Sequence, residues 1–320
     1  MLQRSWRLTA LNLFLLFLLL AGLIIIPRLI VPFNPLSLVL LAVLIYGMTA
    51  LNRARSVFTP TRFPLLRTEP DALGLPAFEE VTFSSVDGID LSGWYIPAQN
   101  RAAIILVHSI GGSRVQMRHY GRALVAQGYG VLLFDLRAHA RSDGTASTFG
   151  WLETNDLLGA VKFLKTRPEV DPQRIGVLGV SLGAQIALRG AALSPDIRAV
   201  WADGPIPIVY QDHVGGTPTV RERFLAPWWT LAYRVQEWLT GLSQPAPLTT
   251  LISQISPRPV FVVASGDNRL IHVARKFFDA AGDPKTWWQL DEIPFASGIL
   301  EKGDDYDFKM IGFFKKALKE

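Results

Sequence analysis

From residue 78 onward, short apolar runs alternate with longer amphipathic segments. Two runs of alternating apolar and polar residues, 79–85 and 91–97, flank an Asp87–Gly88 turn and are predicted to form a β-hairpin. Short buried strands are predicted at 102–108, 130–135, 175–179, 199–202 and 260–264, and a last strand at 286–293. Helices are predicted between them at 114–127, 151–165, 182–193, 272–281 and 304–318. This alternation predicts an α/β fold with a mostly parallel sheet flanked by helices, whose ligands bind beyond the carboxyl ends of the strands.

An irregular insertion at about 205–255 interrupts the alternation. Its apolar residues have roughly helical spacing: Phe224, Leu225, Trp228, Trp229, Leu231, Val235 and Trp238. We expect a small helical lid, with Trp228 and Trp229 beside the pocket and Gly215–Gly216 as its hinge. The apolar face of this lid either packs onto the core or touches a bilayer interface, where Trp is favoured.

The first fifty residues contain two apolar runs, 8–26 and 36–51, with prolines between them. A membrane span needs about 20 apolar residues, so residues 1–52 are predicted to form a transmembrane hairpin. A linker at 53–77 and a domain at 78–320 follow. A single span with an interfacial helix, or a cleaved signal peptide, are the alternatives. Arginines on both outer flanks place the domain on the cytoplasmic side of the cell membrane.

Composition narrows the class of protein further. The chain has no cysteine, which excludes a disulfide framework, and its net charge of +5 is modest. Because it has no long basic run, we expect no nucleic acid as a partner and interpret the positive charge as attraction to anionic membrane lipids. No cluster of His, Asp or Glu has metal-ligand spacing, so neither a metal nor another cofactor is expected. The oligomeric state stays open.

A Gly-x-Ser-x-Gly motif centred on Ser181 carries the candidate chemistry. Gly179 and Gly183 flank the serine between the strand predicted at 175–179 and the helix predicted at 182–193. A serine on such a sharp turn exposes its hydroxyl, and the following helix N-terminus offers N–H groups to a developing oxyanion. A serine that only caps the helix is the alternative.

Two more segments accompany this motif, VHSIGGSR at 107–114 and FDLRAHARSDG at 134–144. Together they make the region from about 75 to 318 resemble the α/β-hydrolase fold superfamily, and within it membrane-anchored bacterial serine hydrolases such as esterases, lipases and aminopeptidase-like enzymes. The resemblance implies an oxyanion hole formed by the backbone N–H groups of Leu182 and Ile110. Ser109, Ala138 and Ala140 stand where glycines are usual. His108 and Ser109 are expected beside the pocket, and Asp203 at its mouth.

The triad acid and base follow later in the chain. Asp267 lies directly after the strand at 260–264, where the resemblance implies the acid, although an Asp there also serves to cap the next helix. The base should follow the last strand, but residues 293–300 read IPFASGIL and contain no histidine. The missing histidine aligns with Gly298 or falls between Ser297 and Gly298.

None of the five histidines is a good replacement. His108 and His139 are expected to satisfy local backbone groups, and His119 lies on a predicted surface helix. His213 is in the lid, and His272 is only five residues from Asp267. A general base contributes about 10²–10⁴-fold to the rate, so activity is expected to be impaired.

Three hypotheses follow. The first is a Ser181 hydrolase of carboxylic ester, thioester or amide bonds, acting on a small or lipid-like acyl substrate. The second is a catalytically inactive protein that binds an apolar ligand or partner at the membrane. The third is an acyltransferase.

Overall fold

The computed structural model describes residues 10, 13–14, 17, 43–52, 74–214 and 219–319, which belong to two compact units. Thr59–Ile208 and Ala246–Glu320 form one unit, here called the sheet unit. Met1–Phe58 and Val209–Pro245 form the other, here called the helical unit. The candidate nucleophile and the predicted acid both belong to the sheet unit.

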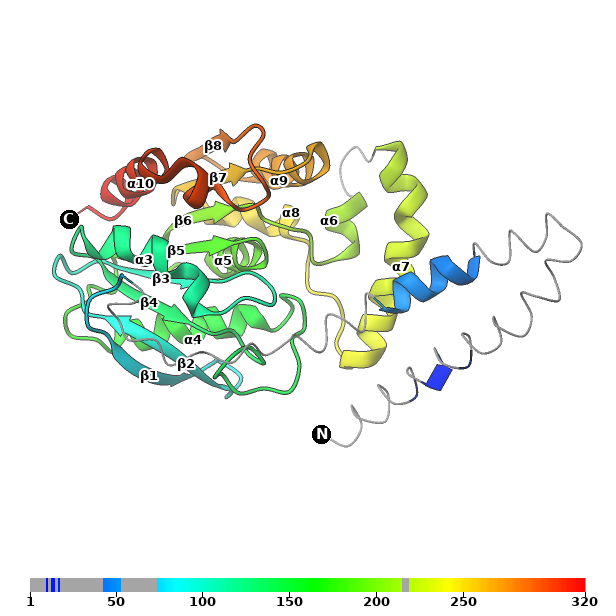
Figure 1. Cartoon of the computed structure of the whole chain (residues 1–320), viewed down its shortest axis with the longest axis horizontal. Coiled ribbons are helices and arrows are strands. Elements are labelled where there is room, and N and C mark those ends of the chain that lie inside the picture. Colours follow the sequence, from blue (N-terminus) through cyan, green and yellow to red (C-terminus); the bar gives the residue numbers. More distant parts are fainter. Residues whose placement is uncertain are drawn as a thin grey trace, which may run out of the picture. The chain divides into compact units, whose positions relative to one another are not determined.

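An eight-stranded sheet organises the sheet unit in the order β1-β2-β4-β3-β5-β6-β7-β8 (Figure 1). Its strands are β1 (Glu79–Ser84), β2 (Asp90–Ile96), β3 (Ala103–Val107), β4 (Gly130–Phe134), β5 (Ile175–Val180), β6 (Ile197–Asp203), β7 (Val260–Ala264) and β8 (Lys285–Gln289). β2 pairs antiparallel with β1 and with β4, and all the other pairs are parallel. The predicted hairpin and mostly parallel sheet are confirmed. The parallel strands all end at one edge, where the loops after β3, β5, β6, β7 and β8 meet.

Helices cover both faces of this sheet. The helices of the sheet unit are η2 (Arg114–Met117), α3 (Arg118–Val125), α4 (Glu153–Lys165), α5 (Leu182–Leu193), α8 (Leu248–Leu251), η3 (Ile252–Ile255), α9 (Asn268–Ala280) and α10 (Gly298–Ala317). α3 and α10 contact each other on one face, whereas α5 packs on β5 and β6 beside α4. Because strand side chains alternate between the faces, each face has its own apolar core.

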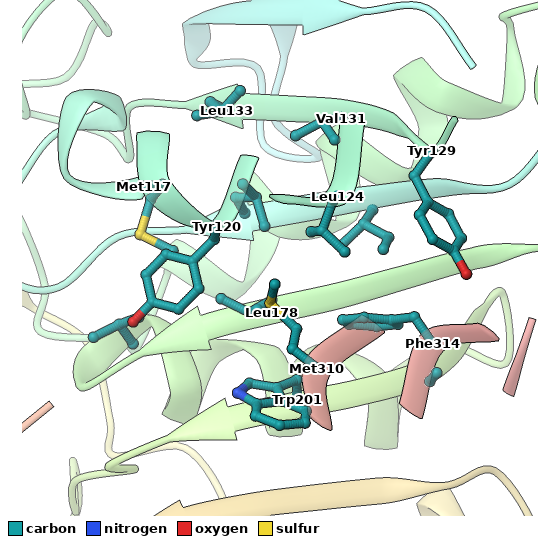
Figure 2. Close-up of a cluster of buried hydrophobic side chains, with 14 of the residues drawn as sticks. Met117, Tyr120, Leu124, Tyr129, Val131, Leu133, Leu178, Trp201, Met310 and Phe314 are labelled. Atoms are coloured by element: carbon teal, nitrogen blue, oxygen red, sulfur yellow. The ribbon is translucent and has the colours of Figure 1, made fainter. Parts of the chain in front are cut away.

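The core under α3 and α10 is shown in Figure 2. Met117, Tyr120 and Leu124 project from α3 and its preceding turn, and Met310 and Phe314 project from α10. They enclose alternate residues of the central strands, among them Val131, Leu133, Leu178 and Trp201. This core fixes the position of Asp203, two residues beyond Trp201.

Two predicted boundaries differ at the carboxyl end. β8 ends at Gln289 and not at 293, because the chain turns away there and Glu292 has a φ of 60°. The helix predicted at 304–318 is the main part of α10, which has a kink at Gly303 and an extra turn from Gly298. The residues between β8 and α10 therefore form a loop at the carboxyl edge of the sheet.

The helical unit contains residues 43–52, which are helical, α6 (Tyr210–Val214) and α7 (Val220–Thr240). A capping box between Thr219 and Glu222 begins α7, and Gly241 ends it with a φ of 68°. The indole Nε1 of Trp228 donates to Thr49 Oγ1 at 3.0 Å, so α7 contacts the N-terminal helical segment. The range 205–255, where a helical insertion is predicted, contains α6 and α7, whereas its last helices, α8 (Leu248–Leu251) and η3 (Ile252–Ile255), belong to the sheet unit.

In the ranges that the structure describes, no helix is both long and apolar enough to cross a membrane. Most of the predicted span 8–26, the first part of the span 36–51, most of the linker at 53–77 and the hinge at Gly215–Gly216 lie outside the described residues.

Candidate active site

Ser181 occupies a strained turn between β5 and α5. Its φ of 56° and ψ of −113° are unusual for a residue with a side chain and cost of order 1–3 kcal/mol. The turn is held by the Ser181 N–H, which donates to the carbonyl oxygen of Asp203 at 2.8 Å. The serine side chain makes no capping hydrogen bond to α5. The hydroxyl is therefore not used to start the helix.

The two glycines of the motif are required by close packing. A β-carbon on Gly179 would collide with the carbonyl of Gly183, and one on Gly183 would collide with the carbonyl of Val107. The turn at Ser181, here called the elbow, therefore packs against the end of β3, next to the loop that contains Ile110. The two predicted halves of the oxyanion hole come from these adjoining segments.

Backbone N–H groups of both segments remain available at this junction. Helix geometry leaves the N–H of Leu182, the first residue of α5, without an acceptor inside the helix. In the neighbouring loop, the N–H of Ser109 donates to Gln116, that of Gly111 to His139 and that of Gly112 to Ser109. Among the described residues, the N–H of Ile110 has no such acceptor, and neither has that of Ser113 further along the loop. The amides of Leu182 and Ile110 are thus suited to bind an oxyanion.

His108 and His139 join the two motif segments rather than acting as bases. His108 Nε2 accepts from the Leu136 N–H at 3.0 Å, and its Nδ1 bonds the carbonyl of Ser109 at 2.7 Å. Burial and the nearby His139 lower the pKa of His108 to about 4, so its ring is neutral. His139 likewise uses both ring nitrogens, on Gly111 N and on the carbonyl of Arg137. Neither ring has a nitrogen left for the Ser181 proton.

A buried ion pair fastens the same two segments. Arg114, which is fully buried, donates from its backbone N–H and its guanidinium to Asp135 at 2.8 and 2.9 Å. Ala138 and Ala140, the residues that replace glycines of the resembled family, have φ values of 61° and 36°. The fold keeps the glycine-like backbone there and accepts strain at both alanines.

Glu153, which the sequence interpretation overlooked, shapes the wall beside the elbow. Its buried carboxylate accepts four hydrogen bonds, from Ser147 Oγ, Thr148 N, Thr148 Oγ1 and Gly150 N. A β-carbon on Gly150 would lie 3.1 Å from Leu182 Cδ1 and 3.0 Å from Ile208 Cδ1. The loop held by Glu153 therefore packs directly against the residue after the nucleophile. In the sequence, the only indication of these hydrogen bonds is that the acidic Glu153 follows Ser147 and Thr148 within six residues.

Asp267 follows β7 at the same edge of the sheet and is exposed. Its Oδ1 accepts from the Leu270 N–H at 2.9 Å and caps α9. The capping role is present in the structure. That Asp267 is the triad acid stays a prediction. The cap uses Oδ1, so Oδ2 is available to accept a hydrogen bond from a histidine.

The loop after β8, in which the resemblance implies the base, contains the aromatic ring of Phe295. Ala296 N donates to Ser265 Oγ at 2.9 Å, and Gly266 N donates to the carbonyl of Ile293. A β-carbon on Gly204 would lie 2.7 Å from Phe295 Cε2. Phe295 thus covers the turns that follow β6 and β7, and it has no titratable group.

Gly298 is a poor position for the missing base. It is buried, and a β-carbon there would lie 2.7 Å from Leu290 Cδ1 and 2.8 Å from Tyr306 Cε2. A side chain at 298 would therefore enter the core under α3 and α10. An imidazole deleted between Ser297 and Gly298 agrees better with this geometry.

Asp203, expected at the mouth of the pocket, is fully buried instead. Strand alternation turns its carboxyl to the same face as Trp201, where Oδ2 accepts from the Tyr306 hydroxyl at 2.8 Å. Burial raises the pKa of Asp203 to about 6, and hydrogen bonds from Tyr306 and Tyr120 oppose the rise. Asp203 contributes to the site through its backbone carbonyl, which holds Ser181.

The remaining histidines lie in other parts of the molecule. His119 is on α3, the helix that covers the opposite face of the sheet from α5. His213 belongs to the helical unit, where its Nε2 lies 3.0 Å from the Tyr233 hydroxyl and its ring stacks on Trp229 at 3.6 Å. His272 is on α9. In the described ranges, no group of three or more His, Asp or Glu is arranged to hold a metal ion.

Comparisons with known proteins agree with this geometry. The family described as alpha/beta hydrolase fold matches residues 102–234. The Pyrococcus furiosus esterase Pf2001 is 26% identical, with a TM-score of 0.64 over 82% of this chain and 99% of that one. Polyketide transferase ATR5 of Stachybotrys chlorohalonatus is 27% identical over 75% of this chain and 98% of its own.

Thiohydrolase apmlB of Arthrinium phaeospermum is 34% identical over 43% of this chain. The match spans only 46% of that thiohydrolase's length. With the strand order, these findings establish that the chain has the α/β-hydrolase fold, and they support a hydrolase in general terms.

Proposed function

We propose that this protein is a serine hydrolase of carboxylic ester, thioester or amide bonds, with Ser181 as nucleophile and an incomplete triad. The observation that supports it most is the pairing of a strained serine, whose hydroxyl makes no cap, with the amides of Leu182 and Ile110, which have no acceptor among the described residues. Strain of this kind persists where function requires it. A serine needed only for folding would not require the two free amides beside it.

The reaction consists of two acyl transfers. Ser181 Oγ attacks the substrate carbonyl, and the amides of Leu182 and Ile110 stabilise the oxyanion of the tetrahedral intermediate. The bond to the leaving alcohol, thiol or amine breaks, and the leaving group takes up the serine proton through water. Water then attacks the acyl-serine, releases the carboxylic acid and returns the proton to Ser181. Without a positioned imidazole both steps are slow, because only the oxyanion hole and binding remain, which give about 10³–10⁴ over water.

Insertion of a histidine between Ser297 and Gly298 tests this proposal. The variant should hydrolyse a p-nitrophenyl ester about 10²–10⁴-fold faster than the native chain, because a general base contributes that much. Insertion of alanine at the same place is the matched control and should give no gain. Addition of Ser181→Ala should remove the gain.

Phe295→His is a second route to the same test, because this ring lies over the turns after β6 and β7. If both histidine variants are folded and neither turns over the ester faster than the native chain, the proposed machinery is wrong.

Two other functions have an observation in their favour. An inactive binding protein agrees with Phe295 in the loop that should supply the base. An acyltransferase agrees with the similarity to a polyketide transferase along 75% of the chain. Product analysis with an added alcohol separates these cases, since an acyltransferase forms the new ester and a binding protein forms no product.

A further inference from the structure

Part of the outward face of α7 is apolar, whereas a surface helix is usually polar there. The exposed Arg223, Thr230 and Arg234 lie along one edge of this part. Val220 is 86% exposed, Phe224 76%, Trp238 41% and Leu231 38%, and Pro227 is also exposed. At 3.6 residues per turn these five residues lie within an arc of about 60°. We call these five residues the apolar stripe.

This stripe is not the face by which α7 packs in its own unit. Ala232, Tyr233, Gln236 and Leu239 are buried and lie on the opposite side of the helix. Trp228 and Trp229 belong to that inward half, because Trp228 bonds Thr49 and Trp229 stacks on His213. The exposed face therefore contains apolar area beyond what the helix needs for its own packing.

The charges at the start of α7 point to the kind of partner. Arg221 and Arg223 are exposed and make no ion pair with the described residues. The acidic Glu222 between them is engaged in the capping box with Thr219. Two cations in the first turn are unfavourable for the helix dipole. Anionic groups bound there would offset this effect.

The N-terminal helical segment has the same character. Val43 is 63% exposed and Ile45 53%, and this segment contacts α7 through Thr49. In the sequence it continues the apolar run at 36–51. The helical unit thus combines several exposed apolar side chains with arginines that form no ion pair within the described part of the chain, as helices that lie in a membrane interface do.

We propose that the apolar stripe docks on a lipid bilayer that contains anionic lipids, with α7 lying in the plane of the headgroups. Phe224, Leu231 and Trp238 enter the acyl boundary, and Arg221 and Arg223 contact lipid phosphates. This inference does not depend on the activity of Ser181.

Position-specific fluorescence on the full chain tests the proposal. The chain has no cysteine, so Phe224→Cys and Leu231→Cys each carry one environment-sensitive nitrobenzoxadiazole label. Val86→Cys and Leu193→Cys are matched controls, because both replace exposed apolar residues of the sheet unit. This readout reports α7 itself, whatever residues 1–42 do with lipid.

On vesicles of phosphatidylcholine with phosphatidylglycerol, the labels at 224 and 231 should shift to the blue and be quenched by brominated acyl chains, and the controls should not. Arg221→Gln with Arg223→Gln should remove the difference between these vesicles and pure phosphatidylcholine. Labels at 224 and 231 that behave like the controls would overturn the proposal. So would a blue shift without vesicles that grows with protein concentration, because a second copy of the chain would then cover the stripe.

Discussion

At the scale of single residues, Asp203 makes the stability of the fold depend on pH. Its pKa is about 6 in the fold against 3.8 for an ordinary Asp, because the carboxyl is buried. The folded state therefore binds more protons than the unfolded state between about pH 4 and 6, and the Asp203 contribution to stability falls as pH rises through that window.

Asp203→Asn should remove this fall. The unfolding free energy of the variant relative to the native chain should increase by about 2.5 kcal/mol from pH 4 to pH 7, at about 1.4 kcal/mol per pKa unit. Urea denaturation across this range measures the difference, with the exposed Asp291→Asn as control. A difference that stays constant with pH would contradict the assignment.

Single residues also show what the sequence could predict. The spacing of Gly179 and Gly183 around Ser181 was sufficient to predict the elbow, because only glycine allows the two close approaches. The direction of the Asp203 side chain was predictable in principle, since strand alternation puts it on the face of Trp201. That this face is buried became clear only from the structure, because the helices that cover it, α3 and α10, come from distant parts of the chain.

At the scale of elements, two of the three glycines in α10 have opposite roles. Gly298→Ala should lower the unfolding free energy by about 1–3 kcal/mol, because its β-carbon would overpack Leu290 and Tyr306. Gly312→Ala should raise it by up to about 1 kcal/mol, since nothing lies within 4 Å and alanine favours the helix. Thermal unfolding of the two variants compares them directly. Equal effects would show that the start of α10 is not packed as described.

Element boundaries were predictable where a local signal exists. The helix predicted at 304–318 begins directly after Gly303, whose φ of 41° breaks the helix. The end of β8 was placed four residues too late, because TWWQLDEI remains strand-like in composition after Gln289. The strand ends where Leu290 N donates to the carbonyl of Ala264. A contact between residues so far apart in the chain cannot be predicted from the apolar–polar alternation.

At the scale of the whole molecule, the chain consists of a sheet unit with the candidate site and a helical unit with the apolar stripe. The insertion predicted at 205–255 contains the second part of the helical unit, Val209–Pro245. Its association with Met1–Phe58 is absent from any local pattern, because the two segments are separated by most of the sheet. The absence of a histidine from residues 293–300, by contrast, can be read directly from the sequence.

Reaction with a fluorophosphonate, followed by peptide mapping, tests most directly whether Ser181 is a nucleophile. Attack by its hydroxyl on phosphorus releases fluoride and leaves a stable adduct, and the amides of Leu182 and Ile110 should favour this step even without an imidazole. We predict one slowly formed adduct on Ser181, which Ser297→Ala retains and Ser181→Ala loses. No adduct on the folded chain, or an adduct on another residue, would contradict the account.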